Sequence, residues 1–153
     1  MRILVAAVGR AKASEPACVL AEDYATRLRW PIEFREVEER RKLPTPRRVE
    51  REGELLLALV PDGAVIVALD ERGRSISSAG FADKLLKWQE RGVGDLAFLI
   101  GGADGHADTV RKRAEFMLSL GPMTWPHLLV RALLAEQLYR AQTILDGHPY
   151  HRS

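Results

Sequence analysis

The sequence predicts an α/β fold, a three-layer sandwich in which helices cover both faces of a mainly parallel sheet. Segments typical of strands alternate along the chain with segments typical of helices. The strand-like segments are nearly continuous apolar runs, as expected for strands that are buried on both faces. The chain has 153 residues and no internal repeat, so we expect a single domain spanning residues 1–153.

The predicted strands are short and rich in apolar residues. AVIVALD (64–70) is the strongest, because Val and Ile are frequent in it and the turn Pro61-Asp62-Gly63 precedes it. PIEFREVEE (31–39) alternates only in part and predicts a half-exposed strand. The other predicted strands lie in residues 2–8, in residues 95–102 and, as a short last strand and turn, in residues 117–125.

The predicted helices begin near polar or proline residues. The segment 14–30 offers Ser14 as an N-cap and Pro16 in its first turn. The segment 75–92 is amphipathic, has serine caps and ends at Gly92, which is a favourable C-cap. The remaining predicted helices lie in residues 45–60, 107–116 and 126–145.

The last predicted helix is apolar on more than one side. Such a helix must be buried on most sides, and in a chain of this size we expect a second copy of the protein to cover the additional face. The alternative is that the chain's own sheet buries the helix entirely. The apolar residues concerned are Leu128, Leu129, Val130, Ala132, Leu133, Leu134, Ala135, Leu138, Ala141, Ile144 and Leu145.

Composition and charge are those of an ordinary globular protein, with 46% hydrophobic residues, 29% charged residues and a net charge of +2. No apolar segment approaches the roughly 20 residues that cross a membrane, and the N-terminal apolar run stops at Gly9-Arg10 without a signal-peptide cleavage pattern. The one cysteine, Cys18, excludes an internal disulfide and favours a buried apolar role. We therefore expect a cytoplasmic protein that does not associate with membranes.

One segment concentrates positive charge. RRKLPTPRR (40–48) contains five cations and no carboxylate. A run of this kind is usually a solvated loop, and the functional alternative is contact with the phosphate groups of RNA. The candidate RNA-binding residues are Arg40, Arg41, Lys42, Arg47 and Arg48.

Three loops follow predicted strands and are the candidate ligand site. In parallel sheets, ligands bind beyond the carboxyl ends of the strands, which here are VALDERG (67–73), LIGGADG (99–105) and SLGPMTWPH (119–127). Glycine allows a ligand to approach main-chain amides, although tight turns also need glycine for backbone reasons alone. No dinucleotide-binding or Walker fingerprint is present, which disfavours an unrelated nucleotide-binding enzyme. The loops suit an adenosine-bearing cofactor that carries no phosphate.

Several motifs together resemble the RlmH family of SPOUT-class methyltransferases, which methylate N3 of a pseudouridine in 23S ribosomal RNA. They are the glycine motif in LIGGADG (99–105) and the Pro-His-x-x-x-Arg, Glu-Gln-x-Tyr-Arg-Ala and terminal Tyr-His-Arg motifs in residues 119–153. The likeness covers essentially the whole chain and includes VGR (8–10) and ALDERG (68–73).

The resemblance implies S-adenosyl-L-methionine as cofactor, a SPOUT-like C-terminal trefoil knot, and a homodimer with its active sites at the interface. Relatives commonly have a serine-rich, leucine-containing version of GPMTWP (121–126), so the Trp125 side chain would reshape the adenine pocket. The cofactor-binding residues implied are Leu69, Gly101, Gly102, Gly121, Pro122, Met123, Thr124, Trp125 and Pro126.

Methylation of N3 requires the loss of its proton and stabilisation of charge on the two flanking carbonyl groups. Arginine and histidine can donate hydrogen bonds to these carbonyls, and histidine can accept the proton. For His127 a capping role is the alternative, and Arg131 would otherwise pair with a carboxylate; which residue acts as the base stays open. The candidate catalytic residues are His127, Arg131, Tyr150, His151 and Arg152.

The leading hypothesis is thus a ribosomal RNA methyltransferase, and the alternative is a non-catalytic, ribosome-associated binding protein with the same fold. We expect no metal, because the spacing of His127, His148 and His151 matches no standard ligand motif. His148 is expected to be structural. The tail residues are expected to be held across the dimer interface, to complete the neighbour's active site, and to become ordered only with RNA.

Overall fold

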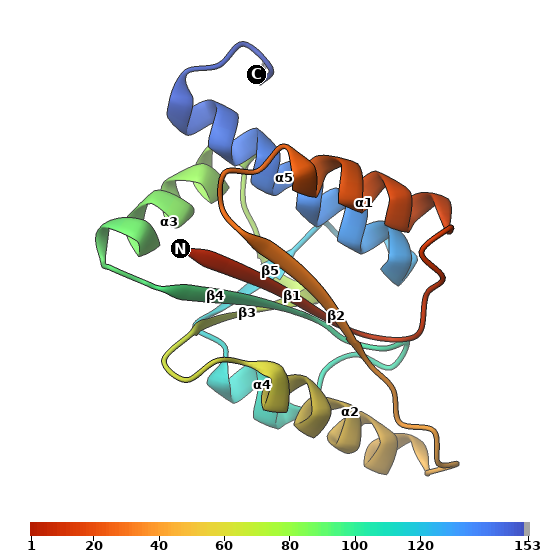
Figure 1. Ribbon diagram of the computed structural model, residues 1–153. Coiled ribbons are helices and arrows are strands. Elements are labelled where there is room, and N and C mark those ends of the chain that lie inside the picture. Colours follow the sequence, from red (N-terminus) through yellow and green to blue (C-terminus); the bar gives the residue numbers. More distant parts are fainter. Residues whose placement is uncertain (152–153) are drawn as a thin grey trace.

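The computed structural model describes residues 1–151 and contains one five-stranded sheet. Its strand order is β2-β1-β4-β3-β5, and all neighbouring strands are parallel. Helices α1, α3 and α5 cover one face and helices α2 and α4 the other, which confirms the three-layer α/β prediction (Figure 1). The elements are β1 (Arg2–Val8), α1 (Pro16–Thr26), β2 (Ile32–Val37), α2 (Thr45–Leu59), β3 (Val65–Ser75), α3 (Ser78–Glu90), β4 (Asp95–Ile100), α4 (Asp108–Arg113), β5 (Phe116–Ser119) and α5 (His127–Asp146).

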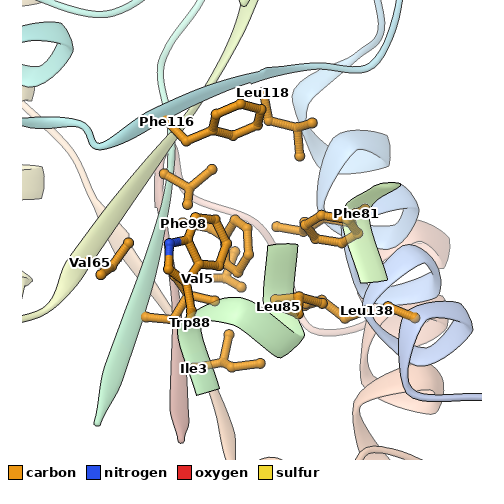
Figure 2. Close-up of a cluster of buried hydrophobic side chains, with 14 of the residues drawn as sticks. Ile3, Val5, Val65, Phe81, Leu85, Trp88, Phe98, Phe116, Leu118 and Leu138 are labelled. Carbon is orange, nitrogen blue, oxygen red and sulfur yellow. The ribbon is translucent and has the colours of Figure 1, made fainter. Parts of the chain in front are cut away.

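The central strands β1, β4 and β3 are buried on both faces, as their continuous apolar runs predict. On one face, Val5 and Phe98 pack against Phe81 and Leu85 of α3 and Leu138 of α5 (Figure 2). Full burial of one such side chain stabilises the fold by roughly 1.5–3 kcal/mol. On the other face the sheet packs against Leu56 of α2 and Val110 of α4. Among residues 1–151, no helix combines the length and apolar composition that crossing a membrane requires.

Several predicted ends of helices and strands differ from the structure. The helix predicted for residues 107–116 ends at Arg113, because Phe116 is buried in the sheet and pairs with Val67 of β3. The strand predicted for residues 64–70 continues to Ser75 through an irregularity in its pairing with β5. Ser14 does not cap α1, whose N-cap residue is Glu15, without a side-chain capping bond.

Helix α5 is shielded largely by its own chain. None of its residues from His127 to Leu145 is fully exposed, because α1 and α3 lie on either side of it over the sheet (Figure 1). Ala132 and Ala135 let Ala21 of α1 approach closely. Much of the apolar surface that the sequence assigns to a second copy is therefore covered within one protomer. Half-buried apolar side chains remain at Leu128, Leu129, Val130 and Leu133.

Helix α2 crosses the start of α4 at a glycine. A Cβ atom at Gly53 would lie 2.9 Å from the Ala107 Cβ and 3.3 Å from the Val110 Cγ2. The first of these separations is too short for two carbon atoms, so a larger residue would push α2 away from α4. This contact matters for function because Ala107 lies two residues after the glycine motif.

We expect Gly53→Leu to lower the free energy of unfolding by about 1–3 kcal/mol, the usual cost of overpacking a close contact. Urea denaturation followed by circular dichroism measures this change. Gly94→Ala is the matched control, because no atom lies within 4 Å of the added Cβ. Equal unfolding midpoints for the two variants would contradict the prediction.

Candidate functional site

The loops that follow β3, β4 and β5 enclose a cavity of about 740 Å³ at the carboxyl edge of the sheet. Its volume is typical of a small-molecule site, for which about 300–1,000 Å³ is usual. Apolar walls come from Leu69, Ile100, Leu118 and Leu120, and charged side chains lie at the rim. The cavity thus forms where the sequence predicts a ligand site. Eight of the nine predicted cofactor residues line it, namely Leu69, Gly101, Gly102, Gly121, Met123, Thr124, Trp125 and Pro126, whereas Pro122 does not.

The glycine turn, residues 101–105, forms one wall and is too tightly folded for side chains. A Cβ atom at Gly101 would lie 3.1 Å from the carbonyl carbon and oxygen of Gly105. Gly105 has a φ of +83°, and its amide donates a hydrogen bond of 3.1 Å to the Gly102 carbonyl. The glycines are therefore required for backbone reasons, and the same lack of side chains leaves the wall open to a ligand.

The His106 side chain holds this turn against the end of β4, a role that the sequence does not predict. The side chain is buried, and its Nε2 donates to the Leu99 carbonyl over 3.1 Å. Burial lowers the pKa of His106, which keeps the imidazole neutral. A single histidine after a glycine motif offers no sequence signal for this role, because the contact depends on how the turn folds back on β4.

An ion pair between Asp70 and Arg111 closes another side of the cavity. The Arg111 Nε donates to Asp70 over 2.9 Å, and the Arg72 amide donates to the same carboxylate over 2.9 Å. Burial alone would raise the pKa of Asp70, but these hydrogen bonds outweigh it and hold the pKa below its usual value. Asp70 is consequently ionised and neutralised by arginine. The pairing joins residues far apart in the sequence, so neither residue was predicted.

Helix α2 reaches the glycine turn from outside the cavity. Arg48 donates to Asp104 over 2.6 Å, which links the basic segment to the turn. One turn further along α2, the Glu52 carboxylate lies against Gly102, where a Cβ would be 3.1 Å from one oxygen and 3.2 Å from the other. Burial raises the pKa of Glu52. The carboxylate is therefore held in a partly dehydrated position beside a cavity wall.

The two candidate catalytic residues of helix α5 differ in position. His127 lines the cavity, with its Nδ1 3.5 Å from the Gly101 carbonyl oxygen. Arg131 does not line the cavity; it is buried and pairs with Glu36 of β2 over 3.0 Å. Glu36 also accepts a hydrogen bond from the Ala11 amide over 2.8 Å. Within the protomer Arg131 thus fixes the loop after β1, which is the structural alternative that the sequence left open.

The tail folds back on its own subunit as far as it is described. The Tyr150 hydroxyl donates to Glu136 over 3.1 Å, and its ring packs edge-on against Tyr139 at a centroid distance of 4.7 Å. Burial, together with these neighbours, raises the pKa of Tyr150. The His148 Nδ1 accepts from the Tyr150 amide over 3.1 Å, a structural contact of the kind expected for His148.

The structure describes two of the three catalytic candidates in the tail. Tyr150 is held within one protomer, which differs from the expectation that it is held only across a dimer interface. His151 is half-buried, and within residues 1–151 no partner contacts its Nδ1. Arg152 lies outside the described residues.

In the folded chain, nearby carboxylates offset much of the positive charge of residues 40–48, the basic segment. The Arg41 guanidinium pairs with Glu39 over 2.9 Å, and its hydrogen bonds lower the pKa of Glu39 to about 2. Arg40 lies 4.0 Å from Glu38, and Arg48 forms an ion pair with Asp104. Within residues 1–151, the predicted RNA-binding residues with no carboxylate within 4.0 Å are Lys42 and Arg47.

The chain is similar in sequence to relatives over their whole length. The chain is 60% identical to the ribosomal RNA large subunit methyltransferase H of Paramagnetospirillum magneticum, over 99% of both chains. The proteins with the same name from Rhodospirillum centenum and Rhodospirillum rubrum are 54% and 52% identical, each over 100% of both chains. The similarity therefore extends over all the loops that build the cavity.

Solved structures show the same fold at low sequence identity. A probable methylase family protein from Haemophilus influenzae aligns with a TM-score of 0.57 and 11% identity over 95% of this chain, which spans 66% of that protein. A protein whose structure concerns 2-OH methylation of C/U34 on tRNA aligns with a TM-score of 0.51 and 19% identity, over 96% of this chain and 98% of that one. A family model described as a predicted SPOUT methyltransferase matches residues 1–151. Together with the full-length relatives, this match shows that the chain belongs to the SPOUT methyltransferase family.

Proposed function

We propose that the protein transfers a methyl group from S-adenosyl-L-methionine to N3 of a pseudouridine in 23S ribosomal RNA. The observation that carries the proposal is 60% identity, over essentially the whole chain, to a protein named ribosomal RNA large subunit methyltransferase H. The cavity supports it, because it lies where the family resemblance predicts the cofactor and is built from the same residues. Cytoplasmic location follows from a ribosomal substrate.

The walls of the cavity fit this cofactor. Gly101 and Gly102 expose main chain, and apolar side chains such as Leu69 and Leu118 offer a surface for an adenine ring. A phosphate-bearing cofactor would need unpaired cations, but both arginines that line the cavity within residues 1–151 lie near Asp70, Arg111 at 2.9 Å and Arg72 at 3.7 Å. When bound, S-adenosyl-L-methionine supplies an electrophilic methyl group on a cationic sulfur.

The chain's own residues then have to place the base and remove a proton. His127 stands at the cavity wall, where it is available to hydrogen-bond a carbonyl of the base or to accept the N3 proton. The apolar walls of the cavity strengthen any such hydrogen bond to developing charge. Arg131 contributes indirectly, because its pair with Glu36 holds the neighbouring loop. Of the tail, His151 and Arg152 are the remaining catalytic candidates for contact with the target base.

We further propose that the protein works as a homodimer with a C-terminal trefoil knot. Val19 and Leu20 of α1 are 56% and 44% exposed, and half-buried apolar side chains of α5 lie on the neighbouring helix. A second copy that covered them would bring its own tail toward the cavity. The knot is supported by membership in the SPOUT methyltransferase family, whose model matches residues 1–151.

Methyl transfer is tested directly with radiolabelled S-adenosyl-L-methionine and ribosomes from cells that lack this protein. We expect label in 23S ribosomal RNA, mapped to N3 of one pseudouridine. Truncation after Tyr150 should lower the rate by at least about 100-fold if the removed residues act as general catalysts. Lys87→Ala, on the exposed surface of α3, is the control and should retain the rate. Full activity of the truncated protein would exclude a catalytic role for the tail, and cofactor binding without transfer would indicate a non-catalytic ribosome-associated protein.

RNA binding by the basic segment is tested by a salt series. The Lys42→Ala/Arg47→Ala double variant should bind ribosomes more weakly, because these cations are the ones without a nearby carboxylate in residues 1–151. The slope of log affinity against log salt should fall by roughly 0.7–0.9 for each phosphate that the variant no longer neutralises. Lys87→Ala serves again as the control on the opposite face of the sheet (Figure 1). Parallel slopes for the variant and the unmodified protein would exclude phosphate binding at this segment.

A further inference from the structure

Glu52 carries a negative charge beside the cavity. No step of the proposed methylation involves this residue. Its two carboxylate oxygens lie 3.1 and 3.2 Å from the position that a Cβ atom of Gly102 would occupy, and Gly102 itself lines the cavity. Gly53 fixes this position, because the close crossing with Ala107 allows α2 to approach the glycine turn. The side chain is half-buried, so water and salt screen its charge only in part.

Two of the other carboxylates that line the cavity are neutralised by arginine, whereas Glu71 is exposed to solvent and makes no ion pair within 4.0 Å in residues 1–151. Asp70 is paired with Arg111 over 2.9 Å, and Asp104 with Arg48 over 2.6 Å. Within residues 1–151, Glu52 makes no ion pair within 4.0 Å and no side-chain hydrogen bond. The cavity wall at Gly102 therefore carries a net negative potential from α2.

A negative potential has a specific consequence for a cofactor whose charge changes during the reaction. The methyl donor carries a positive sulfur, and the S–CH₃ bond breaks with its electron pair remaining on that sulfur. The product, S-adenosylhomocysteine, is a neutral thioether of otherwise identical structure. We infer that Glu52 is a specificity-determining residue that makes the cavity bind the cationic donor more tightly than the neutral product.

This inference rests on the proposed cofactor and deepens it, because it concerns the choice between the donor and its product at one site. Glu52 does not have to touch the ligand. A charge held a few ångströms behind a main-chain wall, in a partly dehydrated position, still acts on another charge across it. The expected preference for the donor that depends on Glu52 is about tenfold.

The test is isothermal titration calorimetry of the full chain with S-adenosyl-L-methionine and, separately, with S-adenosylhomocysteine. Glu52→Gln keeps the shape of the side chain and removes its charge. We expect about tenfold weaker binding of the donor and a change of less than about twofold for the product. Retained product binding also shows that the variant is folded. Glu54→Gln, on the exposed side of the same helix, is the matched control and should bind both ligands as the unmodified protein does.

Each remaining outcome counts against the inference in a different way. An equal loss of affinity for both ligands would show that Glu52 only shapes the glycine turn. Unchanged affinity for both would show that its charge does not reach the cavity. Either result leaves the proposed function standing if the unmodified protein binds the donor. If the unmodified protein binds neither ligand, the proposed cofactor is wrong and the inference falls with it.

Discussion

The close packing of main chain around the glycine turn is the constraint on which the site depends. A Cβ atom at Gly101 would lie 3.1 Å from main-chain atoms of Gly105, and one at Gly102 would lie 3.1 Å from the Glu52 carboxylate. The turn can fold this tightly because β4 ends in the middle of the sheet, with β1 and β3 on either side. A side chain at Gly101 would have to shift main chain, and one at Gly102 would have to shift the Glu52 side chain. The tight packing thus favours glycine at this cavity wall, and the wall is open to ligands because it lacks side chains.

Helix α2 connects this wall to the basic segment at its N-terminal end. The Arg48–Asp104 pair is about two-fifths exposed on both partners, and an exposed pair of this kind contributes at most about 1 kcal/mol. The position of α2 must therefore depend mainly on apolar contacts, on Leu56 in the core and on Gly53 against α4. Under the proposed RNA binding, Arg47 and Arg48 therefore lie on the same helix that carries Glu52.

The sequence predicts the sheet and the cavity loops well, because both depend on local patterns. Continuous apolar runs mark the central strands, and glycine or proline marks each loop. The predicted end of α4 is wrong because Phe116 is compatible with a helix or a strand. Only its pairing with Val67 of β3 places it in a strand. The sequence could not predict the roles of Asp70, His106 and Glu52. Each role depends on neighbours that only the tertiary fold brings together. Arg131 was identified by its motif, but its pairing with Glu36 is likewise a tertiary contact.

The interactions of Tyr150 limit how the tail can serve a neighbouring protomer. Its hydrogen bond to the charged Glu136 contributes about 1.5–3 kcal/mol, and its edge-on packing against Tyr139 adds about 0.5–1.5 kcal/mol. A tail that left its own subunit entirely would give up both interactions, and new ones across the dimer would have to offset them. Under the proposed homodimer, an arrangement that keeps Tyr150 on its own subunit is therefore less costly. The phenol would then be a positioning residue rather than one that contacts the partner's substrate.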